Sequence, residues 1–213
     1  MTVSVHVANG ARRMTDKTVA DVQQGIADAV NAMEVHIRLG DIAVFVQPAE
    51  FGPMGRAYGP ESFSIFINPD ASDIKAWDSS RYKHLAVHEL SHVLRWQHLP
   101  LKTFDDWTPG EVLSLEGHAT QTEVFLGLPH YNITDANEAD VQPLLDRLTP
   151  DVARPCKDVD WFDGTCDLPD GIMRAAGPMG HIVFGRYLKR SGQTPFSAIA
   201  APWQEIWDVG ATA

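Results

Sequence analysis

The residues best suited to chemistry in this 213-residue chain lie in the segment His88-Glu89-Leu90-Ser91-His92. On a helix, the two histidines are one turn apart and project from the same face, so both imidazoles can reach one metal ion. The intervening Glu89 is offset to the side, where its carboxylate can hold and deprotonate a water at that metal. Residue types and spacing therefore predict a zinc site that activates water for hydrolysis.

The apolar residues around this segment predict how its helix is oriented. At about 100° per residue, five of them fall within one arc: Ala86, Val87, Leu90, Val93 and Leu94. His88 and His92 lie nearly opposite that arc. We therefore expect a helix over about residues 78–99 that buries one side and turns its imidazoles towards a cleft. The alternative is an exposed amphipathic helix with two solvated histidines.

A catalytic zinc needs a third protein ligand, and His98 is the nearest candidate. It follows His92 by six residues, which matches the histidine spacing of the metzincins. That motif requires a glycine at the position of Arg95, where the helix must end. In an unbroken helix, His98 points about 120° away from His92. The alternative to a ligand role is that His98 is an ordinary residue at the C-terminal end of the helix, where the helix dipole favours histidine.

Glu116 is the second candidate for the third ligand. Residues 108–126 read as a helix that starts with a capping box, and its apolar positions share one face with Glu116 and Glu123. A carboxylate on an apolar face is costly unless it is paired or bound to a metal. One of the two glutamates could bind zinc while the other accepts a hydrogen bond from a ligand imidazole. Alternatively, this face is the polar side of the helix.

Two motifs together resemble a known family. The segment from His88 to Trp96, followed by Leu115-Glu116-Gly117-His118-Ala119, resembles the bacterial predicted zinc-dependent protease family, whose members carry His-Glu-x-x-His-x-x-Arg and then Glu-Gly-x-Ala. It is more distantly similar to thermolysin and other gluzincins. The resemblance extends over most of the chain, including residues 52–69.

This resemblance implies that His88, His92 and Glu116 bind zinc, that Glu89 is the general base, and that the substrate is a peptide or protein. Arg95, which departs from the metzincin motif, fits this family. Thr120 departs from it, because the family often has an acidic residue there.

An oxyanion stabiliser is expected on the far side of the zinc. Three residues around a predicted helix at 178–189 have suitable side chains: His181, Tyr187 and Arg174. His181 is the first choice for this catalytic role. The alternative is that it is an ordinary helix residue.

The remaining patterns predict a single α+β domain over residues 1–213, a minimal gluzincin-like fold. A small mixed sheet from residues 4–8, 42–47 and 62–68 would pack on the metal-bearing helices. Further helices are expected over the following ranges: 15–33, 138–148 and 202–207. Residues 51–60 read as a Gly/Pro-rich loop. Residues 62–68 are the expected edge strand for an extended substrate.

Composition restricts the partners and the compartment. The formal net charge of −11 disfavours nucleic acid and anionic membranes, since both are bound by basic surfaces. No segment has the ~20 apolar residues needed to cross a bilayer, and the N-terminus lacks the pattern of an export signal. We therefore expect a cytoplasmic protein. Its two cysteines, Cys156 and Cys166, are expected to be reduced thiols in a surface loop, with a single disulfide that closes this loop as the alternative.

The sequence thus predicts a zinc-dependent hydrolase, in its most specific form a metallopeptidase. The alternative is a regulatory or interaction protein that binds zinc on a peptidase scaffold without cleaving anything. Substrate specificity and oligomeric state are left open by these patterns.

Overall fold

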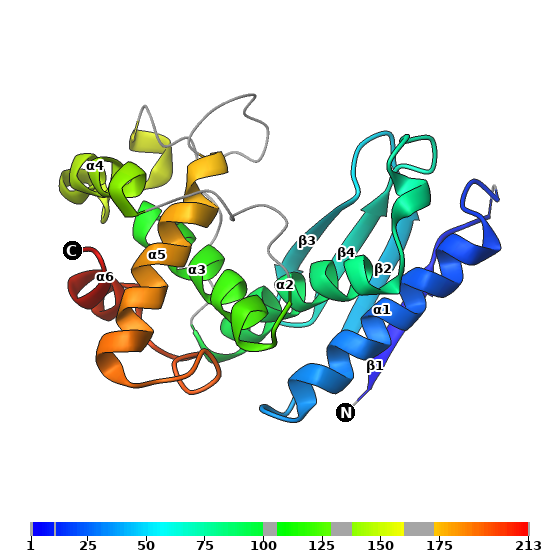
Figure 1. Ribbon diagram of the computed structural model, residues 1–213, viewed down its shortest axis with the longest axis horizontal. Helices are drawn as coiled ribbons and strands as arrows, with labels where there is room; N and C mark the ends of the chain where they lie inside the picture. The colour runs from blue at the N-terminus through cyan, green and yellow to red at the C-terminus, as the bar shows by residue number, and fades with distance from the viewer. Residues whose placement is uncertain (1, 11, 100–105, 129–137, 160–172, 213) are drawn as a thin grey trace. The chain divides into compact units, whose positions relative to one another are not determined.

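The structure is a computed structural model that describes residues 2–10, 12–99, 106–128, 138–159 and 173–212 (Figure 1). Its internal packing divides the chain into two compact units, Met1–His98 and Leu99–Ala213. The expected single domain over residues 1–213 stays a prediction. Among the described helices, none has the length and hydropathy needed to cross a membrane.

The first unit contains the predicted small mixed sheet. Its strands are β1 (Val3–Val7), β2 (Ile42–Pro48), β3 (Met54–Gly59) and β4 (Ser62–Ile67), in the order β1-β2-β4-β3. The pairs β1–β2 and β2–β4 are parallel, whereas β3 runs antiparallel to β4. Together with the helices below, this sheet confirms the α+β class.

The prediction that residues 62–68 form the edge strand is wrong. β4 is paired on both sides, with β2 and with β3, so β3 is the edge strand at this end of the sheet. β3 lies inside the segment 51–60 that reads as a loop. Gly55 and Gly59 weaken its strand signal, because glycine is common in turns. The register of β3 also shifts between Ala57 and Gly59.

Two helices cover one face of this sheet. Helix α1 (Asp16–Glu34) begins at Thr15, whose hydroxyl accepts from the Thr18 backbone N–H, as the sequence predicts. Helix α2 (Ser79–His98) packs against α1, β3 and β4 (Figure 1). The sheet side chains with no exposed surface form the core of this unit: Val44, Val46, Phe63, Ile65 and Ile67.

The second unit consists of helices α3 (Pro109–Phe125), α4 (Glu138–Leu148), α5 (Met173–Ser191) and α6 (Trp203–Gly210). The predicted capping box of α3 is present, because the Thr108 and Glu111 side chains each bond the other's backbone N–H. Helix α5 starts five residues before the expected start at Pro178 and includes that proline. The proline is therefore no start signal here.

A buried apolar cluster joins the helices of the second unit. Helix α5 packs against α3, α4 and α6, and its core includes Leu145, Leu148, Ala176, Met179 and Phe184. Cys156 is 4% exposed and belongs to this cluster, so its prediction as a surface thiol is wrong. Cys156 begins a short 3-10 helix, Cys156–Asp158, and is its buried residue. Cys166 lies outside the described residues. Two other 3-10 turns are Ile74–Ala76 and Thr149–Asp151.

Candidate metal centre

Helix α2 places His88 and His92 one turn apart, as their spacing predicts. Their ring centroids are 4.7 Å apart and the ring planes meet at 86°. His92 is 9% exposed and His88 is partly buried. The pair is therefore set by the helix itself, since residues four apart lie on the same face of an α-helix.

The burial of α2 confirms the predicted apolar arc and removes one alternative. The five apolar residues of that arc have no exposed surface. On the other side, Glu89, His92 and Arg95 are also buried, with exposed fractions of 5%, 9% and 0%. The segment is therefore not an exposed helix with solvated histidines.

Glu89 lies against the edge strand β3. Gly55 of β3 is so close that a Cβ atom built on it would be 2.5 Å from the Glu89 carboxyl carbon. The sequence prediction missed this contact, because residue 55 reads as part of a loop. The only available signal was the presence of a glycine between Met54 and Arg56, two residues with large side chains.

Glu116 lies on α3 and is partly buried, so it is not on a solvent-exposed side of that helix. The next residue, Gly117, allows α3 to approach α5 closely. A Cβ at residue 117 would be 2.7 Å from the backbone carbonyl carbon of Gly180 and from Cβ of Phe184. The glycine of the Glu-Gly-x-Ala motif therefore determines the position of the helix that carries Glu116.

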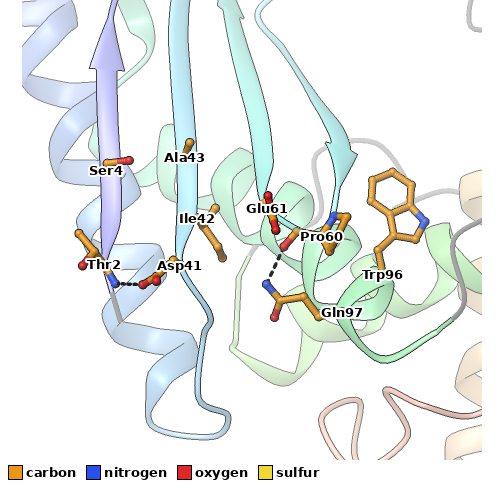
Figure 2. A pocket seen from close by; sticks show the side chains of 9 residues that line it. All are labelled: Thr2, Ser4, Asp41, Ile42, Ala43, Pro60, Glu61, Trp96 and Gln97. Atoms are coloured by element: carbon orange, nitrogen blue, oxygen red, sulfur yellow. Dashed lines mark hydrogen bonds between the residues drawn. The ribbon is translucent and has the colours of Figure 1, made fainter.

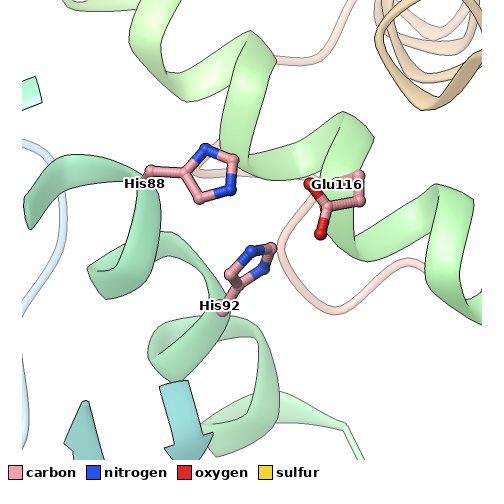
Figure 3. A group of neighbouring side chains, drawn as sticks. All are labelled: His88, His92 and Glu116. Atoms are coloured by element: carbon pink, nitrogen blue, oxygen red, sulfur yellow. The ribbon is translucent and has the colours of Figure 1, made fainter. Parts of the chain in front are cut away.

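His88, His92 and Glu116 form a group with metal-ligand chemistry (Figure 3). One ligand atom from each, an imidazole nitrogen or a carboxylate oxygen, lies within 4.8 Å of the other two. Ligands of a tetrahedral zinc lie about 3.4 Å apart for bond lengths of about 2.1 Å. The donor set thus fits zinc, and imidazole also suits other first-row transition metals.

His98 is placed apart from this group. Helix α2 continues without a break to His98, whose Nδ1 donates to the Leu94 carbonyl oxygen at 2.8 Å. A metzincin-type site requires the chain to turn before this residue. Among the described residues, the metal-ligand group therefore contains Glu116 and not His98.

His181 of α5 lies beside α3, against the residues one turn after Glu116. Its Nδ1 is 3.3 Å from the Thr120 hydroxyl, and its carbonyl oxygen accepts from the Gln121 side-chain amide at 2.9 Å. Thr120 follows Glu116 by four residues, so both are on the same face of α3. Because Gln121 lies on another side of the helix, the contacts place His181 beside the turn of α3 that follows Glu116.

The other side chains proposed around the site have different positions. Tyr187 is 1% exposed, and its hydroxyl donates to Glu205 at 2.6 Å, which gives it a structural role within the second unit. The side chain of Arg174 lies outside the described residues. Glu123 is 3% exposed, so its side chain is buried, as expected from its predicted position on the apolar face of this helix.

A separate cavity of about 770 Å³ lies at the C-terminal end of α2 (Figure 2). It is lined by Trp96 and Gln97, and by residues that begin β1, β2 and β4, including Asp41 and Glu61. The Gln97 side chain donates to the Pro60 carbonyl oxygen at 2.7 Å across this region. None of the proposed catalytic or metal-binding residues lines it.

Comparison with family models, with curated proteins and with solved structures found no match for this chain.

Proposed function

We propose that this chain is a zinc-dependent hydrolase, and more specifically a metallopeptidase. The observation that supports this proposal is the convergence of ligand atoms from His88, His92 and Glu116, with Glu89 next to the first histidine on the same helix. Two imidazoles and one carboxylate are the protein ligands of one class of catalytic zinc site. The location expected from the sequence, the cytoplasm, is part of this proposal.

When bound, zinc would supply a Lewis acid that polarises a carbonyl group and makes water acidic enough to react at neutral pH. The carboxylate of Glu89 would accept the proton of the attacking water, which is the role of a general base. His181 would donate a hydrogen bond to the oxygen that gains negative charge. Its position beside Thr120, one turn after Glu116 on α3, supports this assignment.

The proposed substrate is an extended peptide. Since β3 is the edge strand and lies against Glu89, it replaces residues 62–68 as the strand that would pair with the substrate backbone. Main-chain pairing of this kind needs no particular substrate sequence. Pairing through the backbone is therefore compatible with many peptide sequences. It is also compatible with the acidic net charge of this chain.

Metal content tests the ligand set. Purified protein is expected to bind one zinc per chain, and Glu116→Ala to weaken zinc affinity by at least about 100-fold, since altering even a group outside the ligand shell typically costs 10–100-fold. His98→Ala is the matched control and should bind zinc normally. Loss of zinc in His98→Ala, with normal binding in Glu116→Ala, would reverse the assignment of the third ligand.

Cleavage of a peptide library tests the activity. We expect peptide products that disappear when a chelator removes the metal and return when zinc is added back. A protein that binds zinc at His88, His92 and Glu116 but releases no product from any peptide would support the alternative, a zinc-binding protein without catalysis.

A further inference from the structure

We infer that Gly55 is a positioning residue for Glu89: the missing side chain at residue 55 leaves the space that the Glu89 carboxylate occupies. This inference rests on the proposed hydrolase function, because it concerns the general base of that reaction. It adds a residue on β3, outside both sequence motifs, to the machinery of the site.

The geometry of β3 directs this position towards the helix. Gly55 pairs with Ile65 of β4, which is fully buried on the helix-facing side of the sheet. The flanking residues Met54 and Arg56 are exposed, as expected when successive strand residues point to opposite faces. A side chain at residue 55 would therefore project towards α2.

A side chain at residue 55 would meet Glu89 first. The three atoms nearest to a Cβ at this position are Cγ, Cδ and Oε1 of Glu89, with the Cδ atom at 2.5 Å. No backbone atom is among them. This differs from Gly117, where the Gly180 backbone is in the way. We therefore expect an added methyl group at residue 55 to displace the Glu89 side chain from Cγ to the carboxylate, rather than the strand.

Displacement of the carboxylate would affect a base more than it affects the fold. A general base must be within about 2.6–3.2 Å of the proton that it removes. A shift of about 1 Å in a reacting group can lower the rate by about 100-fold. Gly55→Ala should therefore lower peptide hydrolysis by at least about 100-fold without changing the amount of zinc bound.

Cobalt(II) provides a readout that does not depend on hydrolysis. The visible absorption of cobalt in the zinc site reports the groups around the ion. Glu89→Gln should change this spectrum, and Gly55→Ala should change it in the same direction. Gly10→Ala is the matched control, because a Cβ at residue 10 meets nothing within 4 Å, and its spectrum should equal that of the unchanged protein.

A double-mutant cycle in metal-free protein tests the contact itself. Gly55→Ala should lower the thermal unfolding midpoint when Glu89 is present and should not lower it in a Glu89→Ala background. If Gly55→Ala alone does not fold, recovery of folding in the double variant supports the same contact.

The outcomes separate this inference from the proposed function. Normal cobalt binding with an unchanged Gly55→Ala spectrum, or equal effects of Gly55→Ala in both backgrounds, would overturn the role of Gly55 and leave the hydrolase proposal in place. Failure of the unchanged protein to bind cobalt or zinc would overturn both.

Discussion

The imidazole rings of His88 and His92 are nearly perpendicular, at 86°, with their centroids 4.7 Å apart. Both rings belong to one helix, so the helical spacing brings them together, and their side-chain rotamers set the angle between them. One nitrogen of each ring lies within 4.8 Å of the other. The pair could hold a metal ion together with Glu116.

Replacement of Glu89 by glutamine separates metal binding from catalysis. Glu89→Gln should retain zinc, because Glu89 is not in the ligand group, and lose hydrolysis by a factor on the order of 10²–10⁴, the usual contribution of a general base. Zinc content and the rate of peptide cleavage are measured on the same sample. Glu34→Gln, at an exposed end of α1, is the control. Full activity of Glu89→Gln would exclude the mechanism.

Asp78 should make stability depend on acid pH. Hydrogen bonds from the Ser80 hydroxyl and then from the Arg81 backbone N–H hold the pKa of the Asp78 carboxyl below its ordinary value of 3.8. The folded-state pKa of Asp78 is below its unfolded value. The stability that its carboxylate adds to the folded protein is therefore complete above about pH 4 and is lost as pH falls through the folded pKa.

Asp78→Asn should keep the start of α2, since asparagine also caps helices, and should lose less stability on acidification. Thermal unfolding between about pH 6 and pH 2 measures the difference. Ser80→Ala removes the largest cause of the shift and should give an intermediate result. Identical acid profiles for the three proteins would contradict the prediction.

Two buried tyrosines should respond oppositely to loss of their hydroxyl groups. Within the described part of the chain, no group hydrogen-bonds the hydroxyl of Tyr82, whereas Tyr187 donates to Glu205 and accepts from Gln193. Tyr82→Phe should therefore be neutral or stabilising by up to about 1 kcal/mol, and Tyr187→Phe should cost about 1–2 kcal/mol. Urea unfolding measures both, and a larger loss in Tyr82→Phe would be the contrary result.

Tyr82 also predicts a loss of stability at alkaline pH. Burial, together with the charge of Asp21, raises the pKa of Tyr82 to about 12 from its ordinary value of 10.0. Because the folded pKa is above the unfolded one, the associated stability is complete below pH 10 and is lost as pH rises towards 12. Tyr82→Phe should remove the part of the alkaline loss of stability that is due to this hydroxyl. Unfolding measured between pH 9 and about pH 11 tests this.

Gly117 should be intolerant of a side chain although it lies within a helix. Alanine at an open helical position usually stabilises by up to about 1 kcal/mol relative to glycine. Here its Cβ would meet the Gly180 backbone, and we expect Gly117→Ala to destabilise by about 1–3 kcal/mol. Unfolding in urea measures the change, with Gly10→Ala as the control. Unchanged stability of Gly117→Ala would show that α3 and α5 can separate at little cost.

Features that depend on neighbouring residues could be predicted from the sequence alone. The helical period identified α2 and placed His88 and His92 on one face, and the capping box located the start of α3 at Thr108. The strands around residues 42–47 and 62–68 also follow from local pattern. These features are local because hydrogen bonds within a helix turn, or the alternation along one strand, create them.

Tertiary structure alone decided the features that join distant residues. The proximity of Glu116 to His88 and His92 joins residues that are far apart in the sequence, although the motif resemblance had already pointed to Glu116. Strand order makes β3 an edge, although its glycines read as a loop, and brings Gly55 against Glu89. Local patterns contain the residue types and the periods, but they do not contain the packing that decides which of these residues meet.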